Sequence, residues 1–91
     1  MQFEWDNIKE KANIKKHGIS FREAQEALTC GTVVVLKEDP HHNEQRFVFM
    51  GMCKRLNVLV VVATYPDEEI TRIVSARKAN KMERKIYEAQ L

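Results

Sequence analysis

The stretch ANIKKHGISFREA, Ala12–Ala24, contains the signals for the end of one helix and the start of the next. Gly18 can adopt, without steric penalty, the left-handed conformation that commonly ends a helix. Lys15–His17 would then occupy the last turn, where cations meet the negative end of the helix dipole. Ser20 and Glu23 form the S-x-x-E pattern of a capping box, which opens a second helix. The stretch therefore predicts a helix–turn–helix corner.

Two helices extend from this corner. Asp6 is suited to cap a first helix over Asn7–His17, in which Ile8 and Ala12 recur at the i, i+4 spacing of one helix face. The second helix has an apolar face at positions i, i+3 and i+7, formed by Phe21, Ala24 and Leu28.

After Gly31 the sequence changes to short, β-branched runs. A β-prone start at Phe3–Trp5 precedes the helices, and four further strands are predicted over Thr32–Leu36, Glu44–Met52, Asn57–Thr64 and Glu69–Arg77. The segments between these four strands are the turns DPHHN, KRL and YPD, and such even spacing favours an antiparallel meander.

A third helix is predicted at the C-terminus. Asn80 and Glu83 repeat the capping pattern before a helix over Lys81–Gln90, whose apolar face would be Met82, Ile86 and Ala89. The predicted order is β-α-α-β-β-β-β-α. It indicates an α+β fold in which an antiparallel sheet of four to five strands packs against two N-terminal helices, followed by a C-terminal helix. The length is typical of a single domain, 1–91.

Composition and charge narrow the class of protein. The chain opens without an apolar signal segment, its longest apolar run, Val58–Ala63, is too short to cross a bilayer, and its two cysteines form no CxxC. We expect a cytoplasmic protein with reduced thiols. Residues 70–91 hold 6 Lys or Arg against 2 Asp or Glu. This basic C-terminal segment is compatible with binding of phosphates or an acidic partner, and equally with a helix face exposed to solvent.

Arg72 and Arg77 are the first candidates for a functional site. Arginine presents a planar fork of donors that matches phosphate oxygens. Strict alternation along a strand would place the two side chains on opposite faces, and a bulge between them, or a strand that ends before Arg77, would relax this. The alternative is that both are surface arginines paired with nearby acids such as Glu68, Glu69 or Glu83.

The histidines offer a second kind of chemistry. His41 and His42 lie near Asp39 and Glu44, but no HExxH motif accompanies them, so a role in general acid or base catalysis is better motivated than a metal site. A solvated turn is the alternative reading. His17 already has a structural explanation as the end of a helix.

Several motifs now occur in order along nearly the whole chain. They are F-x-W-D at Phe3–Asp6, N-x-K-K-H-G-I-S-F-x-E-A at Asn13–Ala24, D-P-x-H at Asp39–His42, E-x-R-F at Glu44–Phe47, V-V-V-x-T ending at Thr64, R-I-V-S-A-R-K-A at Arg72–Ala79 and E-R-K-I-Y-E at Glu83–Glu88. This set resembles the BrnT family of toxins from bacterial type II toxin–antitoxin systems.

The resemblance implies a RelE-like α+β fold and a metal-independent ribonuclease, without a cofactor, that cleaves RNA and inhibits translation. It also implies neutralisation by a BrnA-type antitoxin with a ribbon-helix-helix module, so that DNA is contacted only through the antitoxin and no membrane is involved. On this basis Arg72 and Arg77 are expected to stabilise the phosphate and His42 to act as acid or base. Lys16 and Arg46 are expected to position the RNA backbone, with His17 as a reserve candidate.

Two other functions are kept open at this stage. The chain could be a non-catalytic interaction module, an inactive toxin that only binds its antitoxin through the basic C-terminal quarter. It could also be a metal-dependent nuclease that uses His41, His42 and neighbouring acids. Induction without the antitoxin tests the first alternative, and sensitivity to chelators tests the second.

Overall fold

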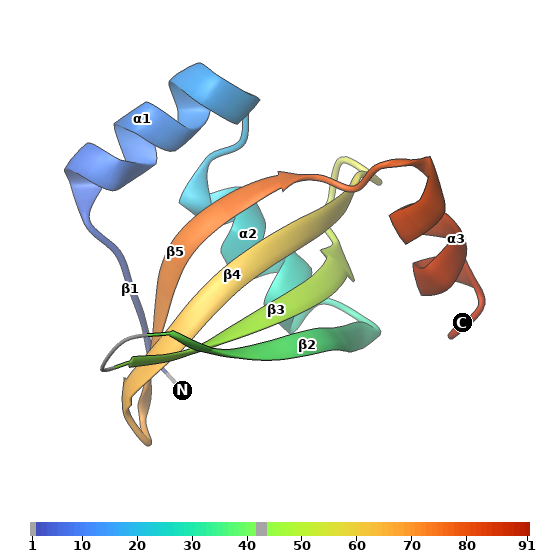
Figure 1. Cartoon of the computed structure of the whole chain (residues 1–91). Helices are drawn as coiled ribbons and strands as arrows, with labels where there is room; N and C mark the ends of the chain where they lie inside the picture. Colours follow the sequence, from blue (N-terminus) through green and yellow to red (C-terminus); the bar gives the residue numbers. More distant parts are fainter. Residues whose placement is uncertain (1, 42–43) are drawn as a thin grey trace.

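The computed structural model describes residues 2–41 and 44–91, and its elements follow the predicted order (Figure 1). They are strand β1 (Gln2–Glu4), helices α1 (Asn7–His17) and α2 (Phe21–Thr29), strands β2 (Val33–His41), β3 (Glu44–Met52), β4 (Val58–Asp67) and β5 (Ile70–Lys78), and helix α3 (Lys81–Glu88). The predicted α+β class is confirmed. Helix α3 ends two residues before the predicted Gln90.

The five strands form one mixed sheet in the order β1-β5-β4-β3-β2. The predicted antiparallel meander is confirmed for β2 to β5. The sheet is not wholly antiparallel, because β1 pairs in parallel with β5 and places Glu4 beside Arg72. Short turns join consecutive strands and make them antiparallel. The connection from β1 to β5 instead contains all the other strands, and a parallel pair needs such a long connection.

Two of the predicted turns are wrong in part. Asp39–His41 of the DPHHN segment continue β2 and pair with Glu44–Arg46, and His42 lies outside the described residues. Tyr65–Asp67 of the YPD segment belong to the end of β4, and the chain turns at Glu68 and Glu69 instead. The KRL turn is confirmed, with Leu56 at a φ of 63°.

The helix corner quoted above is confirmed, but only half of the predicted capping box forms, because the described contacts of the Glu23 carboxylate are with Arg55 and not with Ser20 N. Gly18 has a φ of 72°, and its N–H donates to Ile14 O at 2.7 Å, which closes α1. Ser20 Oγ accepts from Glu23 N at 3.1 Å, as a capping residue should. The carboxylate that bonds the first turn of α2 comes from α1, where Glu10 Oε2 accepts from Phe21 N at 2.9 Å. The corner is therefore held by bonds between the two helices as well as within them.

Helix α1 is attached to the sheet in a way the apolar pattern did not predict. Ile8 and Ala12 are exposed, so the predicted apolar face of this helix is wrong. The buried residue is Asn13, whose Nδ2 donates to Ile19 O and to Ala76 O, both at 2.8 Å. Ala76 N returns a bond to Asn13 Oδ1 at 3.2 Å. An amide can satisfy a backbone N–H and C=O together, so Asn13 fastens the helix to β5 through hydrogen bonds.

The main core lies between α2 and one face of the sheet. It is formed by Ile19, Phe21, Ala24, Ala27, Cys53, Leu59, Val61, Ile73 and Ala76. The backbone of α2 comes very close to β3, because a Cβ added at Gly51 would lie 2.1 Å from Ala27 O. Only glycine leaves room for this approach.

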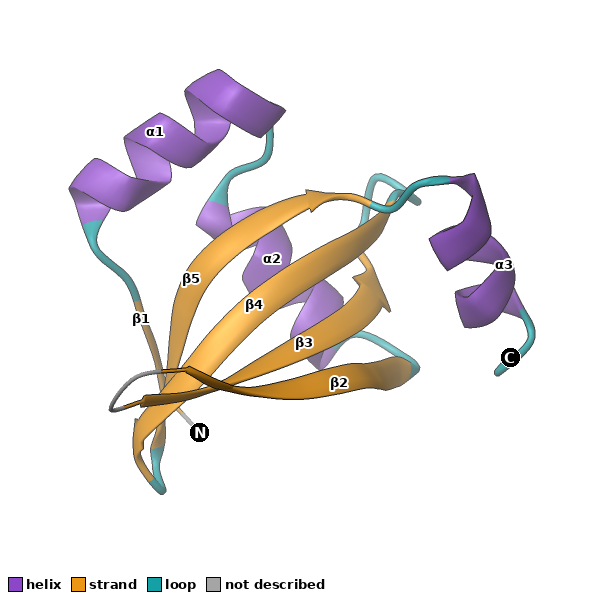
Figure 2. Ribbon diagram, viewed as in Figure 1, coloured by secondary structure: helices purple, strands orange, loops and turns teal. Residues whose placement is uncertain are grey.

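Helix α3 lies on the face of the sheet opposite α2 (Figure 2). Its Tyr87 packs with Val48, Met50, Val58 and Val60, which belong to a second apolar cluster, separate from the main core. The buried residue of α3 is Tyr87, whose hydroxyl donates to Thr32 O at 2.8 Å. Met82 and Ile86 are exposed, so the predicted apolar face of this helix is also wrong. Because α3 covers only one end of this face, the rest of the face stays open.

Candidate functional site

A bulge in β5 decides which side chains reach the open face. Val62 of β4 lies opposite Ser75, but the next residue, Ala63, lies opposite Ile73, so Val74 is an extra residue in β5. The buried side chains of β5, which follow this shifted alternation, are Thr71, Ile73 and Ala76. Paired residues share a face, so Arg72, opposite Thr64, and Arg77, opposite Val60, both project away from α2. A bulge between Arg72 and Arg77, one of the possibilities considered from the sequence, is therefore present.

The open face holds a groove of about 430 Å³ beside α3. Its floor is apolar and consists of Val48 from β3 and of Val60 and Val62 from β4. The other lining residues are Leu36, Lys37, Arg46, Ser75, Arg77 and Glu83. Two of the five predicted site residues, Arg46 from β3 and Arg77 from β5, thus line one groove.

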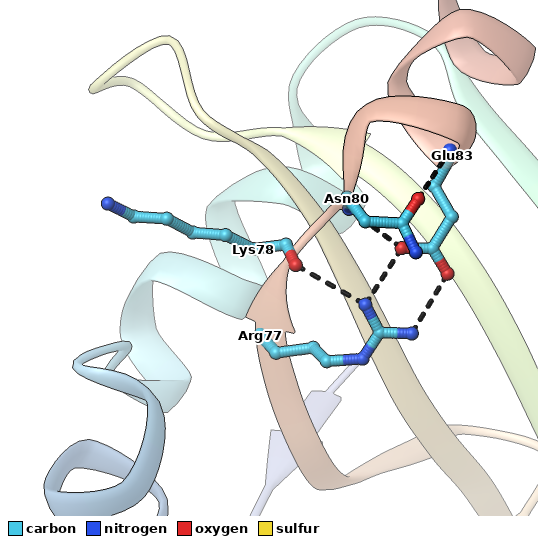
Figure 3. A network of polar contacts seen from close by, with 4 residues as sticks. All are labelled: Arg77, Lys78, Asn80 and Glu83. Atoms are coloured by element: carbon cyan, nitrogen blue, oxygen red, sulfur yellow. Dashed lines mark hydrogen bonds and ion pairs between the residues drawn. The ribbon is translucent and has the colours of Figure 1, made fainter.

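Arg77 is held by a network at the start of α3 (Figure 3). Its Nη1 donates to Glu83 Oε1 at 2.8 Å and its Nη2 to Glu83 Oε2 at 2.9 Å, and Nη1 also donates to Lys78 O at 3.3 Å. Asn80 and Glu83 bond each other's backbone N–H in the predicted capping box. The alternative prediction, that Arg77 pairs with a nearby acid, is thus confirmed, and both partners of this ion pair line the groove.

This network fixes both charges. The hydrogen bonds from Arg77 lower the pKa of Glu83 from 4.5 to about 2, even though partial burial acts in the opposite direction. The same bonds raise the pKa of Arg77 above its ordinary value. Since a general base works best with a pKa near the working pH, Glu83 is poorly suited to remove a proton. It is suited to hold a cation in place.

Arg46 and Thr64 leave polar groups unused beside the groove. They lie opposite each other on β3 and β4, on the open face. Arg46 Nε and Thr64 Oγ1 are both buried, and neither has a hydrogen-bond partner among the residues that the structure describes. Buried donors of this kind are rare and commonly bind water, an ion or a ligand.

Arg72 lies on the same face but outside this groove. Its Nε donates to Glu4 Oε2 of β1 at 2.6 Å, and it lines a separate depression with Asp6 and Lys9. It lies five positions before Arg77, which is roughly 15 Å along a strand. The structure therefore does not bring these two predicted phosphate ligands to one point.

Lys16 and His17 do not line the groove. Lys16 and His17 lie in the last turn of α1, which packs against β5 beside the β1 edge of the sheet (Figure 1). Lys16 is exposed. His42 lies outside the described residues. Among the side chains that the structure describes, no three His, Cys, Asp or Glu residues come together as metal ligands would.

Sequence reasoning missed Lys37, Thr64 and Ser75. Lys37 reaches the groove because β2 has its own register shift after Val35, which places Lys37 opposite Val48. Ser75 reaches it through the β5 bulge. A bulge can only be seen once the partner strand is known, so no local signal marked these residues. Thr64 was within a quoted motif, but nothing in the motif distinguished it from its apolar neighbours.

The mixed five-stranded sheet with its three helices matches the fold of a ribonuclease toxin of known structure. The 1.1 Å crystal structure of the Brucella abortus ribonuclease toxin BrnT matches 89% of this chain and 99% of that chain, with a TM-score of 0.67 and 25% sequence identity.

Residues 5–83 match the family model described as the ribonuclease toxin BrnT of type II toxin–antitoxin systems, and the chain belongs to this family. The comparison with curated proteins found no match. In the described part of the chain, no helix is long and apolar enough to cross a membrane.

Proposed function

We propose that this chain is a metal-independent endoribonuclease that binds RNA in the groove between β2, β5 and α3 and, by cleaving it, inhibits translation. Membership of the BrnT family supports the reaction class. The proposed position of the RNA-binding site rests on one observation: Lys37, Arg46 and Arg77 come together around a floor of valines. Cations beside an apolar floor suit a single strand, whose phosphates pair with charge while its bases lie on apolar surface.

The chemistry requires few groups. A base removes the proton of the RNA 2′-hydroxyl, whose oxygen attacks the adjacent phosphorus, and an acid protonates the 5′-oxygen that leaves. Negative charge develops on the phosphorane, and a fixed guanidinium stabilises it. We assign this last role to Arg77, and we assign the neighbouring phosphates to Arg46 and Lys37.

The other expected residues have places in this proposal. His42 stays the predicted acid or base. Arg72 and Lys16 would contact the RNA only beyond the groove, as sites for flanking phosphates. His17 stays in reserve. Each of these roles is tested by the single variants Arg72→Met, Lys16→Met, His42→Ala and His17→Ala in the cleavage assay below.

The partner follows from the family. A type II system pairs its toxin with a protein antitoxin. We propose a BrnA-type antitoxin that carries a ribbon-helix-helix module, with DNA bound only through that module, and a cytoplasmic location, where the RNA substrate is. Co-expression with the gene next to the toxin gene, followed by purification of the complex, tests this partner.

Cleavage of an end-labelled RNA by the purified chain, with and without EDTA, tests the activity. The matched variants are Arg77→Met, in the groove, and Arg84→Met, an exposed arginine on α3. We expect cleavage that resists EDTA, a loss of about 100-fold or more in the first variant, and no change in the second. Full cleavage by folded Arg77→Met would disprove the assignment. Cleavage abolished by EDTA would support a metal-dependent nuclease.

One observation favours a second function. The Arg77 guanidinium is already bonded to a carboxylate, which is what a structural arginine would show. In that case the chain would be an inactive toxin that only binds its antitoxin. Tight antitoxin binding by folded wild-type protein that leaves RNA intact, both alone and with ribosomes, would support this alternative.

A further inference from the structure

We propose that Glu83 is a positioning residue for Arg77: it occupies one edge of the guanidinium so that the other edge faces the RNA as a complete two-donor fork. This inference rests on the proposed function and deepens it. It starts from a count of donors. A guanidinium has five N–H groups in one plane.

Three of those five are used. Glu83 takes one N–H from each terminal nitrogen, and Lys78 O takes the second N–H of Nη1. The remaining two are Nε–H and the second N–H of Nη2. Within the described part of the chain, all bonds of this side chain are the three just named.

The two unused donors are not scattered. When a carboxylate bonds both terminal nitrogens end-on, Nε–H and the outer N–H of Nη2 point in the same direction, along the adjacent edge of the plane. That edge is the second of the two forks with which arginine binds paired oxygens of carboxylates and phosphates. Arg77 therefore keeps one full phosphate-binding edge while the other is anchored.

The anchor is itself rigid. The Glu83 side chain is 14% exposed, and its Oε1 also accepts from Asn80 N at 2.9 Å. Asn80 Oδ1 accepts from Glu83 N at 2.8 Å, so the carboxylate is tied to the first turn of α3. A side chain with as many rotatable bonds as arginine loses little further freedom on binding RNA when its head group is already fixed.

The anchor also carries an electrostatic cost. Lys37, Arg46 and Arg77 contribute three positive charges to the groove lining, and Glu83 removes one. A positioning role therefore predicts opposite effects on binding and on cleavage. Glu83→Gln should bind RNA more tightly because the groove gains net charge. It should cleave more slowly because a glutamine cannot accept from both terminal nitrogens, so the guanidinium turns away from the required orientation.

The test measures the two quantities separately. Binding is measured with an RNA whose 2′-hydroxyls are replaced by hydrogen, which cannot be cleaved, and cleavage is measured in single turnovers at saturating enzyme. We expect Glu83→Gln to lower Kd by about 3- to 10-fold at low salt and to lower the cleavage rate by about 10-fold or more. Glu88→Gln, the same change at an exposed site on the same helix, should alter neither.

A further variant distinguishes a positioning role of Glu83 from a purely structural one. Asn80→Ala weakens the cap of α3 but leaves both Arg77–Glu83 bonds in place, so we expect it to lower Tm without the opposed changes in Kd and rate. Unchanged Kd and rate in Glu83→Gln, or losses that follow the folded fraction as in Asn80→Ala, would overturn the positioning role. If folded wild-type chain neither binds nor cleaves RNA, the proposed function itself is overturned, and this inference with it.

Discussion

Asn13 in α1 and Ala76 in β5 are joined by two hydrogen bonds of opposite direction, so the asparagine side chain acts as a short piece of backbone paired with the strand. The same amide donates a second time, to Ile19 O in the turn before α2. One side chain thus connects the first helix, the helix corner and the strand that carries Arg77. Its neighbour in the chain, Ile14, is partly exposed, so apolar burial does not replace these bonds.

We expect Asn13→Ala to lower the free energy of unfolding by about 2–4 kcal/mol, because it leaves buried backbone groups at Ile19 and Ala76 without partners. Denaturant titration gives this value. Ile8→Ala is the matched control on the same helix. Ile8 is 80% exposed, and we expect a change within about 0.5 kcal/mol. Equal losses in the two variants would show that α1 is held by apolar contacts after all.

Gly51→Ala should destabilise the chain by about 2–3 kcal/mol or more, because the new Cβ would lie 2.1 Å from Ala27 O and α2 must move away from β3. The comparison is Gly31→Ala. No atom lies near a Cβ at Gly31, but its φ is 79°, so this variant should lose only about 1 kcal/mol from backbone strain. Thermal unfolding of both variants ranks them. A larger loss at Gly31 would contradict the close contact.

Stability should depend on pH through Glu83. Its pKa is lowered in the folded chain to about 2, mainly by the bonds from Arg77, so the unfolded chain takes up a proton more readily as pH falls. The contribution of Glu83 is therefore fully present above about pH 4.5 and is lost between that pH and about 2. The difference in unfolding free energy between wild type and Glu83→Gln should shrink between pH 6 and pH 3. A difference that is the same at both pH values would show that the ion pair is not the source.

RNA affinity should respond to salt through the groove cations. If Lys37 and Arg46 each neutralise one phosphate, Lys37→Met and Arg46→Met should each reduce the slope of log K against log salt by about 0.7, the value for single strands. Lys54→Met, at an exposed residue in the turn between β3 and β4, serves as the control. A reduced slope in the control, with none in the groove variants, would move the binding surface to the α2 side of the sheet.

The parts of the fold that could be predicted are those fixed by neighbouring residues. Asp6, Gly18 and Asn80 act within one helical turn, so their patterns located both ends of α1 and the start of α3. The apolar faces of α1 and α3 failed for a common reason. Each helix has one buried side chain that bonds a distant backbone carbonyl, Asn13 to Ala76 in β5 and Tyr87 to Thr32 just before β2, and apolar periodicity does not predict such bonds.

The residues of the candidate site likewise fall into those that could be predicted from the sequence and those that could not. Residue chemistry identified Arg77 as a candidate and the family resemblance added Arg46, and the structure brings the two to one groove. The distance of Arg72 from Arg77 follows from their spacing in one strand, but the ion pair of Arg72 with Glu4 could not be predicted, since it depends on the pairing of β1 with β5. Nor could residue chemistry indicate Lys37 and Ser75, which reach the groove through register shifts between strands.

The extra residue in β5 also changes how this strand would tolerate a change in length. In a regular strand, loss of one residue turns every later side chain to the other face. Here, deletion of Val74 would remove the bulge and leave Ser75 opposite Val62, with Ala76 still toward α2 and Arg77 still toward the groove. Insertion of a residue has no such compensation. A shortened β5 is therefore compatible with the same arrangement of charges, whereas a lengthened one is not.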